Sequence, residues 1–314
     1  MESLQNIKRR LKGVKNISQI TKAMELVAAT KMRRSQEVAI SSRPYTYAAL
    51  DLLAVLARQG SLHPSPLLQK RPLNHTLVVL ITSDKGLAGS FNSSVIRSFE
   101  SFAKETNIDM KDGSHLFVAI GQKSASYLDR RTPHLIQSFI RFGDFTTVQE
   151  IGNLTKLLVD GYLAERWDKV IAISTHFKTA LRQVVLKRQI LPVDPDLLKK
   201  TADEIVPETG KFAELIRSNG LSFFNEGKDA SEYLIEPSPQ IVLESLVPHL
   251  VEMQLYHIIL EANASEHAAR RTAMKSASDN AEELASNLSL QYNKSRQASI
   301  TKELIEITAG AESL

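Results

Sequence analysis

Apolar residues recur every three or four positions along the C-terminal part of the chain. The repeat includes Leu243, Leu246, Leu250, Met253 and Leu260, and it returns at Ile300, Leu304 and Ile307. Residues 239–309 contain no glycine, and Pro248 is their only proline after Pro239. At about 1.5 Å rise per residue, an uninterrupted helix of this length measures on the order of 100 Å. No single compact domain buries such a helix, so it must pair with another long helix or lie inside a partner assembly.

A second helix with the same periodicity begins at the N-terminus. Residues 2–58 contain only Gly13 and Pro44 as interior helix breakers. Apolar side chains recur there with the spacings that a coiled-coil seam requires, namely Leu4, Ile7, Leu11, Val14, Ile17, Ile20, Met24 and Val27. We therefore predict that residues 1–58 and 239–314 form a long antiparallel coiled coil. Two independent helical bundles are the alternative, less favoured because these stretches lack the turn signals that bundles need.

The residues between the two predicted helices have a different pattern. Proline and glycine interrupt residues 60–75, and β-rich runs then alternate with helical patterns. This alternation is typical of a parallel-sheet α/β domain, and we predict a central Rossmann-like α/β domain at residues 75–238. The expected strands are 77–82, 116–120, 169–175, 183–191 and 232–235. One expected helix follows the first strand and ends near Lys104, and two others span 122–129 and 147–165. Residues 192–230 are predicted to be an extended, insertion-like segment with a helix near 211–218.

A glycine-containing loop follows the first predicted strand. Residues 83–92 read SDKGLAGSFN and lead into a helix, an arrangement that binds phosphates in many enzymes. The loop has neither the Walker nor the dinucleotide-binding glycine spacing, and Lys85 precedes both glycines. A tight turn that needs positive φ or close packing explains Gly86 and Gly89 equally well. A soluble nucleotide-binding enzyme therefore stays an alternative, and we assign no catalytic residue.

Charge is concentrated near the N-terminus, although the net charge of the whole chain is only +4. Residues 1–37 carry nine Lys or Arg against three Glu, which fits either an acidic partner surface or a solvated helix face. A basic coiled-coil nucleic-acid binder is a further alternative, but no aromatic or arginine-rich readout pattern supports it. We therefore predict no nucleic-acid partner.

Candidate chemistry is sparse. The absence of cysteine excludes disulfides, thiol catalysis and cysteine-based zinc sites. The eight histidines have no metal-ligand spacing, and His257 falls at a seam position where a packed or partner-facing imidazole is expected. We predict no cofactor and no metal. No apolar run reaches the length of a membrane span, and the amphipathic helix starts without a presequence.

Four motifs resemble the gamma subunit of the F-type ATP synthase in its bacterial form. Residues 17–32 read ISQITKAMELVAATKM, and the loop at 83–92 matches a stretch that often reads SDRGLCG in that family. Residues 265–274 read SEHAARRTAM, and residues 292–311 read YNKSRQASITKELIEITAGA. The motifs occur in the family's order and cover both termini and the predicted sheet. Ala88 stands where relatives often have Cys, and the absence of cysteine removes the dithiol switch of the chloroplast form.

The resemblance implies a fold and a function. In the family, two long helices form an axle inside a ring of three alpha and three beta subunits, and the central domain meets the epsilon subunit and the c-subunit ring. This implies a non-catalytic rotor shaft that couples proton-driven rotation of the c ring to conformational cycling of the catalytic beta subunits. Membrane association would be indirect, through Fo, on the cytoplasmic side of the bacterial cell membrane.

The resemblance also implies residue roles. The contacts expected with the alpha/beta ring are Met24, Lys31, Arg33, Arg34, Arg270, Gln297 and Thr301. Of these, Met24 is expected to meet beta near Arg270 of the opposing helix. Gln297 and Thr301 are expected where the tip of the C-terminal helix meets the catalytic ring. The basic residues of the N-terminal helix are expected to face acidic loops of beta.

Overall fold

The computed structural model of the chain describes residues 3–41, 43–58, 65–142, 146–194, 196–197 and 235–312. The chain divides into two compact units. One unit joins Met1–Ala29 to Arg270–Leu314, and the other is Thr30–Ala269. Among the predicted elements, the strand at 232–235, apart from its last residue, and the helix near 211–218 lie outside the described residues, as does most of the segment 192–230.

A five-stranded sheet forms the centre of the unit Thr30–Ala269. Its strands are β1 (Thr76–Ile81), β2 (His115–Ile120), β3 (Leu135–Phe139), β4 (Lys169–Phe177) and β5 (Gln183–Leu191). They lie in the order β3-β2-β1-β4-β5, with the first four parallel and β5 antiparallel to β4. The predicted parallel α/β domain is thereby confirmed. The edge strand β3 was not predicted, because its five residues are at best half-buried and show no clear alternation.

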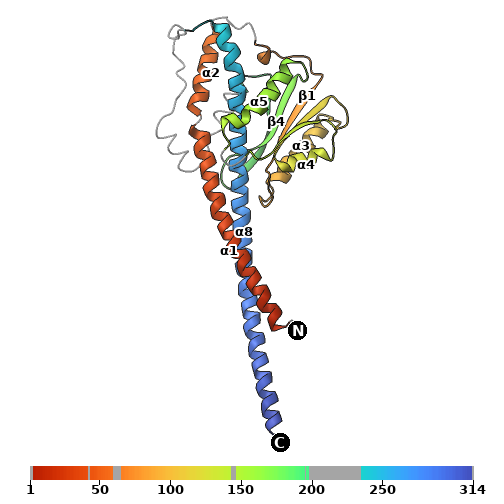
Figure 1. Ribbon diagram of the computed structural model, residues 1–314, viewed down its shortest axis with the longest axis vertical. Helices are drawn as coiled ribbons and strands as arrows, with labels where there is room; N and C mark the ends of the chain where they lie inside the picture. The colour runs from red at the N-terminus through yellow and green to blue at the C-terminus, as the bar shows by residue number, and fades with distance from the viewer. Residues whose placement is uncertain are drawn as a thin grey trace. The chain divides into compact units, whose positions relative to one another are not determined.

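Helices cover both faces of this sheet (Figure 1). They are α2 (Arg43–Arg58), α3 (Phe91–Glu105), α4 (Gln122–Asp129) and α5 (Val148–Leu163), with a short 3-10 helix, η1 (Pro66–Leu68). Helices α3 and α4 bury Phe99 and Leu128 against one face, in a core shared with Val78 and Ile173. The other face packs on α5, α2 and the first part of α8. The sheet is therefore the middle of three layers, as one apolar core on each face requires.

The terminal helices are α1 (Leu4–Ser41) and α8 (Pro239–Glu312). Helix α8 is a single helix of 74 residues with Pro248 inside it, as its apolar repeat predicts. The N-terminal stretch, expected as one helix over residues 2–58, contains α1 and α2. Ser42, the residue between them, lies outside the described residues, so the expectation of one continuous helix stays a prediction. The domain boundaries at 58, 75 and 238 stay a prediction.

Two glycines of α5 allow a sharp test of packing in this unit. A Cβ at Gly161 would overlap the indole ring of Trp167, whereas a Cβ at Gly152 would meet only the end of the Glu252 side chain, at 3.6 Å. Trp167 is fully buried, and its Nε1–H donates to the carbonyl oxygen of Leu158 at 3.1 Å. Gly161 therefore makes room for the only tryptophan of the chain.

We expect Gly161→Ala to destabilise the domain by about 1–3 kcal/mol through overpacking. This outweighs the ~0.5–1 kcal/mol that alanine contributes over glycine inside a helix. Gly152→Ala is the matched control, and we expect it to be neutral or stabilising. Urea unfolding at low protein concentration, followed by Trp167 fluorescence, measures both free energies. Equal effects of the two substitutions would contradict this account of Gly161.

A buried ionic cluster joins α8 to the antiparallel pair β4–β5. Glu261 of α8 accepts from Arg188 Nη1 of β5 at 2.7 Å and lies 3.1 Å from His176 Nδ1 of β4. All three side chains are buried. Burial alone would raise the pKa of Glu261, but the Arg188 guanidinium and the His176 ring outweigh it and hold this pKa below its ordinary value.

The lowered pKa of Glu261 predicts a loss of stability in acid. Because the folded pKa lies below the unfolded value of about 4.3, the stabilisation is present above that pH and is lost as pH falls through the folded pKa. We expect the free energy of unfolding of the wild-type chain to decrease on acidification below about pH 4. Glu261→Gln should show a smaller acid dependence, measured by urea unfolding at several pH values. Equal slopes in both proteins would mean that Glu261 does not contribute.

Candidate partner-binding surface

The unit of Met1–Ala29 and Arg270–Leu314 is a two-helix coiled coil. Its inward positions follow spacings of three and four on both helices. On α1 they are Leu4, Ile7, Leu11, Val14, Ser18, Thr21, Glu25 and Ala28, and on α8 they are Met274, Ser278, Ala281, Ala285, Leu288, Tyr292 and Ser295. The Ser278 hydroxyl lies 3.5 Å from the carbonyl oxygen of Ser18, so small residues let the two backbones approach closely. The predicted coiled coil is confirmed, but its seam is unusually polar.

The predicted seam is wrong in its second half. Ile17, Ile20 and Val27 were expected inside, yet they are 53%, 60% and 54% exposed. The hydrophobic pattern misled here because the 3.5-residue repeat of the seam passes through Ser18 and Thr21 instead. Electrostatics also favours the observed arrangement: Lys22 Nζ lies 3.0 Å from Glu25, and this hydrogen bond, helped by Asp279 and Glu282, raises the pKa of Lys22.

The displaced apolar residues form an outer stripe on α1. We define the outer stripe as Ile17, Ile20, Met24 and Val27, which share one helix face by their spacing. Of these, Met24 is half-buried and the other three are exposed. Such an array of exposed apolar side chains marks an interaction surface.

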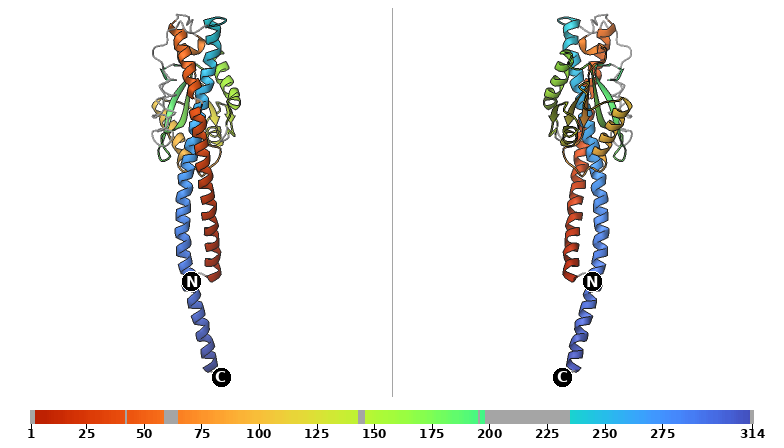
Figure 2. Two further views of the ribbon diagram at one scale, coloured as in Figure 1. Left: turned by 90° about the vertical axis from the view of Figure 1, so that its left-hand side faces the viewer. Right: turned by 90° about the vertical axis from the view of Figure 1, so that its right-hand side faces the viewer.

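A second apolar surface lies at the end of α8. Within the coiled coil, α8 extends past the N-terminal end of α1 (Figure 2). Ile300, Leu304 and Ile307, which were expected to continue the seam, are exposed, as is Ile305. The reason is that α1 begins at Leu4 and does not extend far enough to cover them. We call Ile300, Leu304, Ile305 and Ile307 the apolar tip.

Four of the predicted contact residues belong to this coiled-coil unit. Gln297 and Thr301 are exposed near the apolar tip, and the Thr301 hydroxyl donates to the Gln297 carbonyl oxygen at 3.0 Å. Met24 belongs to the outer stripe, and Arg270 is half-buried on α8. The proximity of Met24 to Arg270 stays a prediction.

The other three predicted contact residues lie on α1 in the unit Thr30–Ala269. Arg33 Nε is 3.1 Å and Arg34 Nη1 3.7 Å from the carboxylate of Glu37, while Lys31 is half-buried. Both arginines are exposed, and ion pairs of this kind contribute little to stability. A carboxylate from a partner could therefore replace Glu37 at small cost.

The loop at residues 83–92 is tied to its neighbours by Asp84. One carboxylate oxygen accepts from the backbone N–H of Gln122, the first residue of α4, and the other accepts from the N–H of Arg141, both at 2.9 Å. The start of a helix is the position at which α/β folds bind phosphate. At α4 the chain's own carboxylate occupies this position.

The two glycines of the loop differ. Gly89 has φ +54°, as a tight turn requires, and the neighbouring Leu87 also has positive φ. Gly86 has neither a left-handed φ nor a heavy atom within 4 Å of an added Cβ. The expected steric reason for glycine is therefore confirmed at Gly89 and wrong at Gly86.

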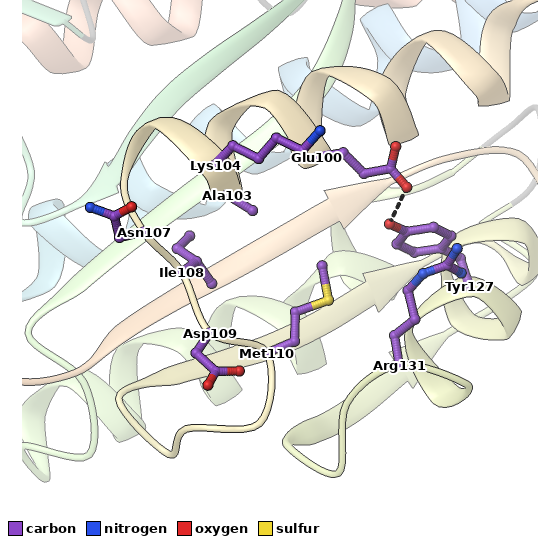
Figure 3. Close-up of a pocket in the computed structure, with 9 residues that line it drawn as sticks. All are labelled: Glu100, Ala103, Lys104, Asn107, Ile108, Asp109, Met110, Tyr127 and Arg131. Carbon is purple, nitrogen blue, oxygen red and sulfur yellow. Dashed lines mark hydrogen bonds between the residues drawn. The ribbon is translucent and has the colours of Figure 1, made fainter.

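A groove of about 800 Å³ lies at the amino ends of the strands, where α3 ends and β2 begins (Figure 3). Tyr127 crosses one end of it and donates to Glu100 at 2.7 Å, with Arg131 stacked on its ring. Burial and the bond to Glu100 raise the pKa of Tyr127 to about 12, so the phenol stays protonated. Because α/β folds bind ligands at the carboxyl ends of their strands, this groove lies at the end of the strands where such a site is not expected.

The described residues contain no group of three or more His, Cys, Asp or Glu arranged to hold a metal ion. His257 and His267 are both buried in α8, so the packed alternative for His257 is the one observed. None of the helices in the described ranges combines the length and apolarity needed to cross a bilayer.

The family model described as ATP synthase matches residues 3–314. The ATP synthase gamma chain of Geotalea uraniireducens (strain Rf4) is 37% identical over 314 residues, covering 100% of this chain and 99% of that protein. The gamma chain of Trichlorobacter lovleyi is 38% identical over 317 residues, with the same coverage.

Solved structures agree on the fold. The central stalk and c-ring structure of the Tetrahymena thermophila mitochondrial ATP synthase contains a similar chain, with a TM-score of 0.58, 24% identity, and coverage of 82% of this chain and 99% of that one. The rotor structure of the Euglena gracilis mitochondrial ATP synthase contains another, with a TM-score of 0.59, 17% identity, and coverage of 95% and 98%. At these identities the structures support the fold, and the full-length sequence matches identify the family. The chain therefore belongs to the ATP synthase gamma chain family.

Proposed function

We propose that this chain is the central rotor shaft of an F-type ATP synthase. In this role it couples proton-driven rotation of the c ring to conformational cycling of the catalytic beta subunits, and it catalyses no reaction itself. Its partners would be the alpha and beta subunits, the epsilon subunit and the c ring. Its place would be on the cytoplasmic side of the bacterial membrane, attached through Fo.

The observation that carries the proposal is the distribution of side chains on the coiled coil. The seam contains Ser18, Thr21 and Glu25, whereas Ile20 and Ile307 face outward at 60% and 68% exposure. A self-sufficient coiled coil buries its apolar residues between its own helices. A partly polar seam with apolar residues outside it fits a pair of helices that a surrounding protein sleeve completes.

The outward surface also suits rotation. The outer stripe and the apolar tip are aliphatic, so their contacts depend on area and not on direction. Gln297 and Thr301, beside or within the tip, are polar and exposed. A sleeve that contacts the stripe and the aliphatic residues of the tip is not held there at one angle, and this is what a turning shaft needs.

The proposal predicts poor behaviour of the chain on its own. Exposed apolar side chains of the outer stripe and the apolar tip should drive self-association or fraying of the coiled coil. Co-expression with the alpha and beta subunits should relieve both and should yield a complex with one copy of this chain per hexameric ring. Light scattering, circular dichroism and affinity co-purification measure the three outcomes. A monodisperse monomer that melts sharply and does not co-purify with the ring would refute the proposal.

A further inference from the structure

Three polar side chains on one face of α8 reach the β4–β5 pair. Gln254, Glu261 and Ser265 are spaced by seven and four residues, which places them in one row along the helix. Gln254 Nε2 donates to the carbonyl oxygen of Gln189 at 3.2 Å, and the Ser265 hydroxyl donates to the carbonyl oxygen of Thr175 at 3.5 Å. Between these two contacts lies the Glu261 cluster, which holds the only charges of the row.

The cluster is closed on all sides. Exposure of the three side chains is only 4–7%. On the side away from the sheet, α1 covers Glu261 through Gln36, Ala39 and Ile40, which leave a cavity of about 10 Å³ beside it. A cavity of this size holds at most one water molecule. The carboxylate therefore depends on Arg188 and His176 for its hydrogen bonds.

Stability alone does not account for buried charges at this place. Removing two charges from water costs several kcal/mol per ion, and well-packed apolar residues of similar volume often do as well or better. Apart from the hydrogen bonds of Gln254 and Ser265, the surrounding contacts between α8 and the sheet are apolar. They include Leu255, Ile258 and Ile259. Apolar contacts are not directional, so they resist sliding or turning of α8 only weakly. The Glu261 cluster adds contacts with a defined distance and direction.

We propose that Glu261, Arg188 and His176 are positioning residues that hold α8 in one register against β4 and β5, so that twist applied to the sheet domain passes into α8 without slip. Helix α8 continues without interruption to Glu312, so a rotation imposed near Glu261 is carried along the same helix. This inference rests on the proposed rotor function. It adds to that function the contact that fixes α8 to the sheet domain.

The test replaces the cluster by apolar side chains in the complete synthase complex. The triple variant Glu261→Met, Arg188→Met, His176→Leu should fold and assemble, because no unpaired charge is left behind. The control variant Lys187→Met, Glu105→Met removes a 3.0 Å ion pair from the same strand at an exposed position. Membrane vesicles then yield ATP-driven proton pumping, ATP hydrolysis and the ratio of the two. Thermal melting of the purified complex reports stability separately.

We expect wild type and control to share one ratio of pumping to hydrolysis, and the triple variant to fall below it by about twofold or more. An unchanged ratio in the triple variant overturns the inference. If the melting temperature falls while the ratio stays unchanged, the cluster only stabilises the folded protein. If the triple variant does not assemble, Glu261→Gln, which keeps the size of the side chain, takes its place under the same criterion. A wild-type complex whose pumping does not depend on this chain would instead refute the rotor function.

Discussion

Met24→Lys is expected to lower ATP-driven proton pumping far more than ATP hydrolysis, while leaving assembly intact. Met24 lies in the outer stripe, where its neighbours on the same face are aliphatic. A lysine there adds a long cation that can pair with an acidic group of beta. In a partly buried interface, such a pair is worth up to a few kcal/mol. The pair would have to break at each step of rotation, so it would impede turning without removing the catalytic sites.

Met24→Ala is the matched control for this substitution. It removes part of the apolar contact but adds no group that could attach to beta, so the ratio of pumping to hydrolysis should stay close to wild type. Both ratios are measured in membrane vesicles that contain equal amounts of assembled complex. If both variants keep the wild-type ratio, Met24 is not a coupling contact.

Arg188→Met alone is expected to destabilise the sheet domain strongly, more than Gly161→Ala does. It leaves Glu261 buried with only His176 as a partner, and breaking a buried ion pair in this way costs about 3–5 kcal/mol. Adding Glu261→Met to the same chain should restore most of the loss, because the unpaired charge is then gone. Amide hydrogen exchange of β4, β5 and residues 255–265 measures the effect in the assembled complex.

The relative stability of the single and double variants distinguishes two explanations of the role of Arg188. If Arg188 acts only through its aliphatic packing, the double variant will be no more stable than the single one. If the charges are coupled as their 2.7 Å contact indicates, exchange protection falls by roughly two to four orders of magnitude in the single variant and recovers in the double variant.

Much of the fold could be predicted from the sequence where one periodicity dominates. The bounds predicted for α4 and β5 agree with the structure to the residue, and α8 was expected as one uninterrupted helix. Short or mixed signals failed. The strand β3 was missed because it lies at the edge of the sheet and alternates poorly.

The candidate surface was predicted less well, for a physical reason. Apolar spacing alone predicts that Ile17 and Ile20 lie inside the seam. A coiled coil that a partner encloses has apolar residues on its outside as well, and then Ser18 and Thr21 can occupy the seam. The Glu261 cluster could not be predicted either. Its members are separated by 12 and 73 residues, and only the sheet topology brings them together.

The most direct test of the rotor assignment is to watch this chain turn. Because it has no cysteine, Leu181→Cys in the β4–β5 turn, where Leu181 is 86% exposed, provides a single site for a fluorescent or bead label. The alpha and beta ring is immobilised, and the label is followed while ATP is hydrolysed. The rotor assignment predicts sustained rotation in one direction that stops when ATP is withdrawn. A label that stays at a fixed angle while the same immobilised complexes hydrolyse ATP would contradict it.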